Sequence, residues 1–208
     1  MKIQEPKVAR CTENTLKNAY EENDFEYSIF TESAEHGFTV SDTTVQTCIF
    51  RGIDFSDIDF EDVYFTDVVF EKCNLTNKRF ECRFLQRVKF SGCKMLGVSF
   101  SEANLRDVTF EGCTAKYINF AETKMNRVAV KDCDFSCASF SETEIKYMEA
   151  ENTDFSETEL YKTPMKDVDL STCNIAALRS DTYSLRGMVV DRFQAQDLVP
   201  ILGVKFKD

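Results

Sequence analysis

Cysteine and histidine are the residue types in this sequence that could act as nucleophiles or hold a metal ion. The chain has nine cysteines but only one histidine, His36, and no pair of cysteines has the CxxC spacing of a zinc site. A catalytic triad needs a histidine beside a nucleophile, and a phosphate loop needs clustered glycines; neither pattern occurs. We therefore expect no catalytic residue, no metal and no cofactor, and we predict that the chain is not an enzyme.

Carboxylates are the second group that could carry a function, because acidic residues outnumber basic ones 36 to 25 and the formal net charge is −11. Such a chain repels nucleic acid and anionic membranes and favours basic partners. Glu102, Glu122 and Glu142 recur at a spacing of twenty. A second acidic group follows close behind them: Glu149, Glu151, Asp154, Glu157 and Glu159. A face that binds a basic groove is one interpretation, and a plain solvated face is the other.

Apolar residues at every fifth position predict the elements that must position these side chains. From Val40 to Val190 every fifth residue is apolar, except Ser180. A second, smaller apolar position lies two residues before each of these and is often valine or cysteine, and cysteines there behave as small hydrophobic residues. Neither the period of an α-helix nor that of an ordinary strand produces this pattern.

Residue identity also repeats at a spacing of twenty, as in Phe60, Phe80, Phe100 and Phe120. This spacing indicates coils of twenty residues that stack identical side chains on one another. Five residues per side then predict a four-sided β-helix that rises by about 4.8 Å per coil, the spacing between neighbouring strands. Glu102, Glu122 and Glu142 would lie on one side of successive coils, where like charges repel.

The repeat resembles that of the pentapeptide-repeat proteins, whose unit is a small residue, Asp or Asn, Leu or Phe, and two variable residues. Ile53-Asp54-Phe55, Ala103-Asn104-Leu105 and Cys133-Asp134-Phe135 fit this unit. The resemblance implies an all-β fold, a right-handed quadrilateral β-helix. We expect this β-helix over residues 1–190, with residues 1–19 as a lead-in or cap.

Three places depart from the repeat. Lys78 and Arg83 stand at inward positions, where an unpaired charge is costly. We expect either a local opening of the coil near residues 77–87 or side chains that reach outward, and we favour such a distortion over a functional site. Pro164 predicts a coil corner or an unpaired edge. Residues 31–38 are predicted to form a projecting loop, which is a place where contacts with a partner often lie. Its candidate contact residues are Glu32, Glu35 and His36.

After Val190 the five-residue period ends and signals of a short α-helix begin. Asp191 is a good N-cap, Gly203 a good terminator, and Pro200 is expected to end the helix early. We expect residues 191–208 to cap the last coil or to form a two-fold dimer contact. The candidate interface residues are Phe193, Ala195, Leu198, Leu202, Val204 and Phe206.

The run Asp191-Arg192-Phe193-Gln194-Ala195, followed by Leu198 and by Leu202-Gly203, resembles the tail of the Qnr and MfpA quinolone-resistance proteins; Pro200 departs from it. The resemblance implies a homodimer of two rods that mimics duplex DNA, binds DNA gyrase or topoisomerase IV, and protects them from quinolones or other poisons. The alternative is a structural or adaptor module that binds a different basic protein.

The location of the protein follows from what the sequence lacks. The N-terminus has no apolar core of a signal peptide, and no stretch of 18 or more apolar residues occurs. An odd number of cysteines without a secretory signal is typical of reduced thiols in the cytoplasm. We expect a cytoplasmic protein with neither a membrane nor nucleic acid as its partner.

Overall fold

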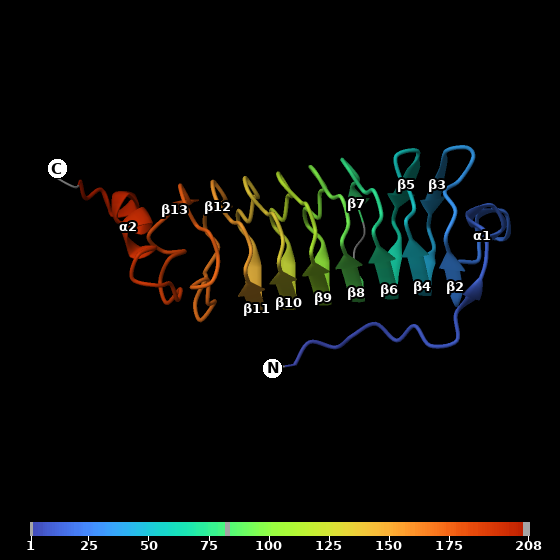
Figure 1. Cartoon of the computed structure of the whole chain (residues 1–208), viewed down its shortest axis with the longest axis horizontal. Helices are drawn as coiled ribbons and strands as arrows, with labels where there is room; N and C mark the ends of the chain where they lie inside the picture. The colour runs from blue at the N-terminus through green and yellow to red at the C-terminus, as the bar shows by residue number, and fades with distance from the viewer. Residues whose placement is uncertain (1, 82–83, 206–208) are drawn as a thin grey trace.

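The computed structural model describes residues 2–81 and 84–205 and shows an elongated parallel β-helix with an α-helix near each end (Figure 1). The widest sheet, called sheet A here, contains in spatial order β1 (Thr12–Glu13), β2 (Ser28–Phe30), β4 (Thr44–Arg51), β6 (Tyr64–Glu71), β8 (Leu85–Ser91), β9 (Asn104–Glu111), β10 (Lys124–Lys131) and β11 (Glu144–Glu151). Two smaller sheets contain β3 (Phe38–Ser41), β5 (Ile58–Glu61) and β7 (Phe80–Glu81), and β12 (Glu159–Leu160) and β13 (Arg179–Ser180).

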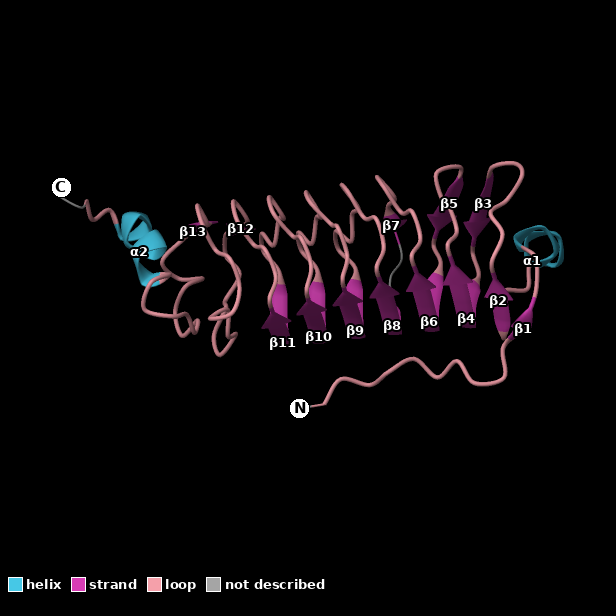
Figure 2. Cartoon of the chain, in the orientation of Figure 1, coloured by secondary structure: helices cyan, strands magenta, loops and turns pink. Residues whose placement is uncertain are grey.

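The strands of successive coils pair in parallel at an offset of twenty residues. Val88 of β8 pairs with Val68 of β6 and with Val108 of β9. On another side of the coil, where no long strand forms, isolated bridges such as Asn119 with Ser139 keep the same offset. The predicted β-helix of twenty-residue coils, with a short C-terminal helix, is therefore confirmed (Figure 2).

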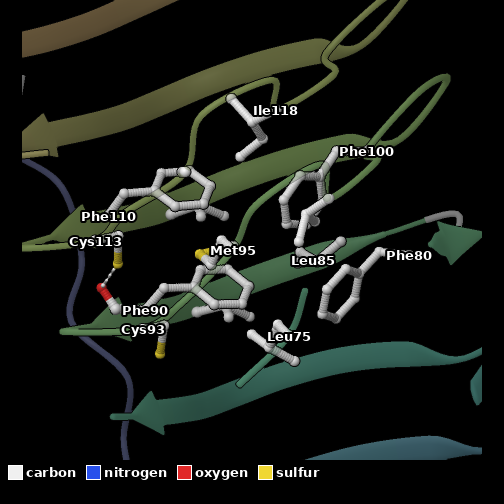
Figure 3. Close-up of a cluster of buried hydrophobic side chains, with 14 of the residues drawn as sticks. Leu75, Phe80, Leu85, Phe90, Cys93, Met95, Phe100, Phe110, Cys113 and Ile118 are labelled. Carbon is white, nitrogen blue, oxygen red and sulfur yellow. Dashed lines mark hydrogen bonds between the residues drawn. The ribbon is translucent and has the colours of Figure 1, made fainter. Parts of the chain in front are cut away.

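Columns of phenylalanine fill the interior of the β-helix (Figure 3). The ring centroid of Phe90 lies 5.0 Å from that of Phe70 and 5.1 Å from that of Phe110, and all three rings are fully buried. Burying one such side chain contributes about 1.5–3 kcal/mol, so the columns supply most of the apolar stabilisation. At the smaller inward positions the buried thiols donate hydrogen bonds to backbone carbonyls. Cys93 Sγ, for example, donates to the carbonyl of Phe70 at 3.3 Å.

The corners of the coils are turns that place one residue in the left-handed region, often a residue other than glycine. Asn77 and Tyr117 have φ angles of 58° and 61°. This conformation costs about 1–2 kcal/mol for a residue with a Cβ. The cost is offset by hydrogen bonds to the next coil, such as Tyr117 N to the carbonyl of Ser136 at 3.0 Å. At Gly97 a Cβ would lie 2.6 Å from Asn77 Oδ1, so a larger residue there would require the Asn77 side chain to shift.

The structure decides between the two alternatives for the inward lysine and shows where the proline lies. Lys78 does not open the coil: its Nζ reaches outward and donates to the carbonyl of Ser56 at 2.8 Å and to Asp59 Oδ1 at 2.9 Å. Arg83 lies outside the described residues. Pro164 marks an unpaired edge, because sheet A ends at β11 and no pairing among the described residues joins β11 to residues 164–170.

The N-terminal residues lie outside the coils and form two structures. Residues 2–11, called the strap here, run along sheet A beneath the strands in Figure 1. Helix α1 (Leu16–Glu22) follows, capped by Thr15, whose hydroxyl accepts from Asn18 N. It buries Leu16 and Ala19 against the core, so α1 covers the open end of the first coil.

The C-terminal segment closes the other end. Asp191 Oδ1 accepts from the N–H groups of Phe193 and Gln194, and α2 (Ala195–Leu198) follows. The chain then tightens into a 3-10 helix over Val199–Leu202, which contains Pro200 near its start and ends at the left-handed Gly203. Among the described helices, none is long and apolar enough to span a bilayer.

Candidate partner-binding surfaces

Three of the predicted acidic residues lie above one another at one corner of the β-helix, as their twenty-residue spacing predicts. The N–H groups of Glu102 and Glu122 donate to the carbonyls of Ala121 and Ser141, each at 2.9 Å, so the corners of successive coils are joined directly. Glu102, Glu122 and Glu142 have φ angles of 62°, 58° and 59°, and all three are exposed. The left-handed turns therefore hold these side chains at the outermost point of each coil.

The same corner is acidic in earlier coils, where Asp42 and Asp62 occupy it with φ angles of 50°. We call the set the acidic corner; its members are Asp42, Asp62, Glu102, Glu122 and Glu142. In the next coil the charge at this corner becomes positive, because Lys162 occupies the position; its Nζ lies 2.7 Å from Glu142 Oε1. Within residues 2–81 and 84–205, Glu102 and Glu122 have no cationic partner, so the corner keeps uncompensated negative charge at its centre.

The predicted group from Glu149 to Glu159 does not join the acidic corner in one patch. Glu149 and Glu151 belong to β11 of sheet A, whereas Glu159 begins β12 on another side of the coil. Several of these carboxylates also have partners: Glu149 accepts from Tyr147 Oη at 2.7 Å, and Glu159 lies 3.0 Å from Arg179 Nη1. The remaining contacts are Glu151 with Lys131, Asp154 with Ser156 and Asn174, and Glu157 with Arg179.

Residues 31–38 follow the path of a coil and do not project from it. Because Ile29 pairs with Ile49 and Phe38 with Ile58, the twenty-residue offset holds on both sides of the segment and leaves no room for an insertion. Phe38 also stacks on Tyr20 of α1, with ring centroids 4.3 Å apart. The expectation of a projecting loop is therefore wrong, although its three candidate contact residues are exposed beside α1: Glu32, Glu35 and His36.

The C-terminal candidates divide into an exposed group and a packed one. Phe193, Leu202 and Val204 are 69%, 61% and 52% exposed, and Ala195 is exposed beside them. Leu198 packs partly against the core, and Phe206 lies outside the described residues. Gln194 is part of the tail motif but was not predicted to make contacts. Its side chain is buried, and its Nε2 donates to the carbonyls of Leu170 and Cys173 at 2.9 and 2.6 Å.

Two family models match the sequence. One, described as a pentapeptide repeat region, matches residues 63–134 and 82–149; the other, described as pentapeptide repeats in eight copies, matches residues 42–77 and 133–171. Together they cover more than half of the chain. The chain belongs to the pentapeptide-repeat family.

Solved structures of other pentapeptide-repeat proteins are similar at low identity. A trypsin-treated variant of QnrB1, a plasmid-mediated fluoroquinolone resistance protein, is 16% identical, with coverage of 88% of this chain and 91% of that one and a TM-score of 0.41. HetL, involved in heterocyst differentiation regulation in the cyanobacterium Nostoc sp. strain PCC 7120, is 14% identical, with coverage of 87% and 85% and a TM-score of 0.45. A comparison with curated proteins gives no match.

Six cysteines of this pentapeptide-repeat protein are packing residues. Cys48, Cys73, Cys93, Cys113, Cys133 and Cys173 are buried. Burial raises the pKa of Cys48 to about 12, which keeps its thiol protonated and unreactive. Among the described residues, no group of three or more His, Cys, Asp or Glu side chains is placed to hold a metal ion.

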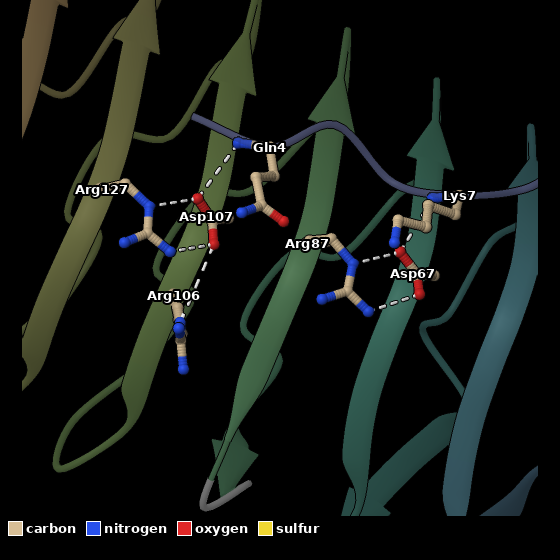
Figure 4. Close-up of polar contacts among 7 residues, drawn as sticks. All are labelled: Gln4, Lys7, Asp67, Arg87, Arg106, Asp107 and Arg127. Carbon is tan, nitrogen blue, oxygen red and sulfur yellow. Dashed lines mark hydrogen bonds and ion pairs between the residues drawn. The ribbon is translucent and has the colours of Figure 1, made fainter. Parts of the chain in front are cut away.

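One feature of this pentapeptide-repeat protein was missed in the sequence: a column of sheet A in which acid and base alternate (Figure 4). Nε and Nη2 of Arg87 donate to Oδ1 and Oδ2 of Asp67, each at 2.6 Å. Nε and Nη2 of Arg127 donate to Oδ1 and Oδ2 of Asp107 in the same way, each at 2.5 Å. We call Asp67, Arg87, Asp107 and Arg127 the paired column. The signal was present, because opposite charges alternate at the twenty-residue spacing.

The strap binds the two carboxylates of the paired column through its main chain (Figure 4). Lys7 N donates to Asp67 Oδ1 at 2.8 Å, and Gln4 N donates to Asp107 Oδ1 at 3.1 Å. Burial alone would raise the pKa of Asp67, but Arg87 and the Lys7 N–H lower it below its ordinary value. Asp67 therefore does not belong to the acidic surface, although the sequence places it near Asp57 and Asp59.

Proposed function

We propose that this pentapeptide-repeat protein binds a type II topoisomerase, DNA gyrase or topoisomerase IV, in place of DNA and protects it from quinolones or other poisons. The observation that carries the proposal is the acidic corner. From Glu102 to Glu142 the corner carries one carboxylate per coil, about every 4.8 Å, and one strand of duplex DNA carries a phosphate about every 3.4 Å. A groove lined by lysine and arginine attracts both by the same electrostatic mechanism.

The rigidity of the support favours this function. Each corner carboxylate stands on a turn that is hydrogen-bonded to the next coil, so binding requires no ordering of a loop. Preorganised charges lose less conformational entropy on association than charges on mobile segments. In the topoisomerase complex the protein would act by occupancy alone, without catalysis, from the cytoplasm where its partner works.

The C-terminal segment supports a further part of the proposal, the association of two rods into a homodimer. Its tail sequence resembles that of the Qnr and MfpA group, and its exposed apolar side chains lie at one end of the long axis. Two-fold association through this end would join two acidic corners in one elongated particle.

The test is gyrase supercoiling with the protein titrated in, with and without ciprofloxacin. We expect rescue of supercoiling in the presence of the drug, or inhibition in its absence. The triple variant Glu102→Lys, Glu122→Lys and Glu142→Lys should lose the effect, because it reverses the charge of the corner. The control with the same change of charge reverses three carboxylates elsewhere, Glu71→Lys, Glu111→Lys and Glu151→Lys, of which Glu151 is exposed and the other two are partly exposed.

The outcomes separate the two functions considered. If the corner variant loses activity and the control variant keeps it, the acidic corner is the contact surface. If the wild-type protein has no effect in either arm, the topoisomerase proposal is wrong, and an adaptor role with another basic partner takes its place.

A further inference from the structure

We propose that the paired column is a binding site for an extended peptide segment of a partner protein, and that the strap occupies this site in the free protein. The proposal concerns a different surface from the acidic corner and does not depend on binding to a topoisomerase. It rests on three observations: a match of spacing, recognition through the main chain, and a site that stays intact when the strap leaves.

The spacing of the paired column matches an extended chain. Its carboxylates, Asp67 and Asp107, stand two coils apart, which corresponds to about 9.6 Å at the spacing of parallel strands. The strap residues that bind them, Lys7 and Gln4, are three residues apart, which corresponds to about 9.3 Å in a polyproline II chain, where N–H groups three residues apart point the same way. Because Arg87 occupies the coil between the two carboxylates, the two acceptors receive the N–H groups of residues three apart, Gln4 and Lys7.

The strap is recognised through its main chain and through small apolar contacts. Lys7 and Gln4 donate their backbone N–H groups, while their side chains are exposed. Between and beside them Ile3, Pro6 and Val8 are half-buried. The ligand class is therefore an extended segment with free N–H groups three residues apart and apolar residues next to them, rather than one fixed sequence.

The site remains organised without the strap. Each carboxylate is held by two bonds from an arginine of the next coil, so removal of the strap N–H leaves the ion pairs in place. The Asp107 side chain is 1% exposed and the Asp67 side chain 9%, so each offers its oxygens from a rigid, nearly dry position. Fixed acceptors of this kind bind a donor with little reorganisation.

The strap itself is loosely attached compared with the coils. Apart from the two bonds to the paired column, its side-chain anchor is Cys11, whose Sγ donates to the carbonyl of Thr47 at 3.1 Å. It contributes no residue to the hydrophobic core, which begins at Leu16. Displacement of the strap therefore opens the site without unfolding a coil.

The experiment uses the full chain and a fluorescein-labelled peptide with the sequence of residues 2–10. The variant Gln4→Pro with Lys7→Pro removes both N–H donors of the strap and leaves the coils unchanged. Fluorescence anisotropy should show at least tenfold tighter binding of the peptide to this variant than to the wild-type chain. A control peptide with proline at the same two positions should not bind, whereas one with alanine there should bind normally.

Equal binding of the peptide to variant and wild type, or no binding to either, would overturn the proposal. Hydrogen exchange on the wild-type chain tests it without any substitution. The amides of Gln4 and Lys7 should exchange at least a hundredfold faster than the amides of Val88 and Val108 in sheet A. Exchange at the same rate would mean that the strap opens only with the coils, and the site would then not be available to a partner.

Discussion

At the scale of single residues, charges inside this protein are tolerated because each one is fully bonded. Asp107 is almost completely buried, yet it accepts two bonds from Arg127 and one from Gln4 N. Lys78 is also buried along its stem and sends its ammonium group outward to Asp59 and to a carbonyl. Among the described residues, no buried side-chain nitrogen or oxygen lacks a hydrogen-bond partner. A buried ion pair of this kind is costly to break, because the remaining charge has no water.

The variant Asp107→Asn tests this residue-scale account. Burial alone would raise the pKa of Asp107, but the hydrogen bonds from Arg127 and from the Gln4 N–H outweigh this effect. The pKa of Asp107 therefore lies below its ordinary value. The stabilisation is therefore present above the unfolded-state value of about 3.9 and is lost as the pH falls through the folded-state value. We expect the variant to lower the free energy of unfolding at pH 7 by about 3–5 kcal/mol and to flatten the loss of stability below pH 4.

Urea denaturation between pH 7 and pH 2 measures both effects of Asp107→Asn. The exposed Glu122, which has no cationic partner among the described residues, supplies the control variant Glu122→Gln, expected within about 0.5 kcal/mol of wild type. Equal losses in the two variants would contradict the account.

At the scale of elements, both open ends of the β-helix are covered by segments outside the repeat. An exposed end would leave a row of unpaired backbone groups as a template for aggregation. At the first coil α1 covers this end with Leu16 and Ala19. At the last coils the Gln194 side chain covers the other end, because its amide group donates to the carbonyls of Leu170 and Cys173.

Replacement of this amide should loosen the C-terminal coils. We expect Gln194→Ala to cost about 1–3 kcal/mol, because the Cys173 carbonyl loses the Gln194 donor and the Leu170 carbonyl keeps only the Cys173 N–H. Hydrogen exchange should show faster exchange in residues 165–190 and an unchanged rate in β8 and β9. The neighbouring exposed Gln196 provides the control, since Gln196→Ala removes no bond to the coils. Uniformly faster exchange along the chain would show that Gln194 does not act locally.

At the scale of the whole molecule, the rod keeps different surfaces apart. The acidic corner follows one edge of the coils, and exposed apolar side chains belong to the tail. The strap lies along sheet A, and the tail stands at one end of the rod (Figure 1). A rigid rod fixes the distances between these surfaces, so a partner at one of them does not compete with a partner at another. This separation is what allows the proposed topoisomerase contact, dimer contact and peptide site to exist on one short chain.

The proposed dimer gives the prediction at this scale. Sedimentation equilibrium of the wild-type protein should give twice the chain mass of 23.9 kDa. The variant Phe193→Asp with Leu202→Asp should give the mass of one chain, because it places two charges in an apolar contact. Tyr117→Asp, at an exposed position on the side of the rod, is the control and should remain a dimer. A wild-type mass of one chain would remove the end-to-end association from the proposed function.

Much of this architecture could be read from the sequence, because it depends on local order along the chain. The five-residue period decides which side chains point inward, and the twenty-residue repeat decides which residues lie above one another. The core columns, the alignment of Glu102, Glu122 and Glu142, and the break at Pro164 follow from these two periods. Gly203 and Pro200 likewise act through their own backbone preferences, so the end of the C-terminal helix was predictable.

The tertiary structure alone decided the rest, because those features depend on contacts between segments that share no period. The path of residues 31–38 was set by strand pairing on both sides of the segment, together with the stacking of Phe38 on Tyr20 of α1. The group from Glu149 to Glu159 was divided by the corners of the coil. Lys78 avoids distortion because Asp59 and a carbonyl happen to lie within its reach. The strap binds through main-chain N–H groups, which every residue except proline possesses, so no side-chain pattern could show where it lies.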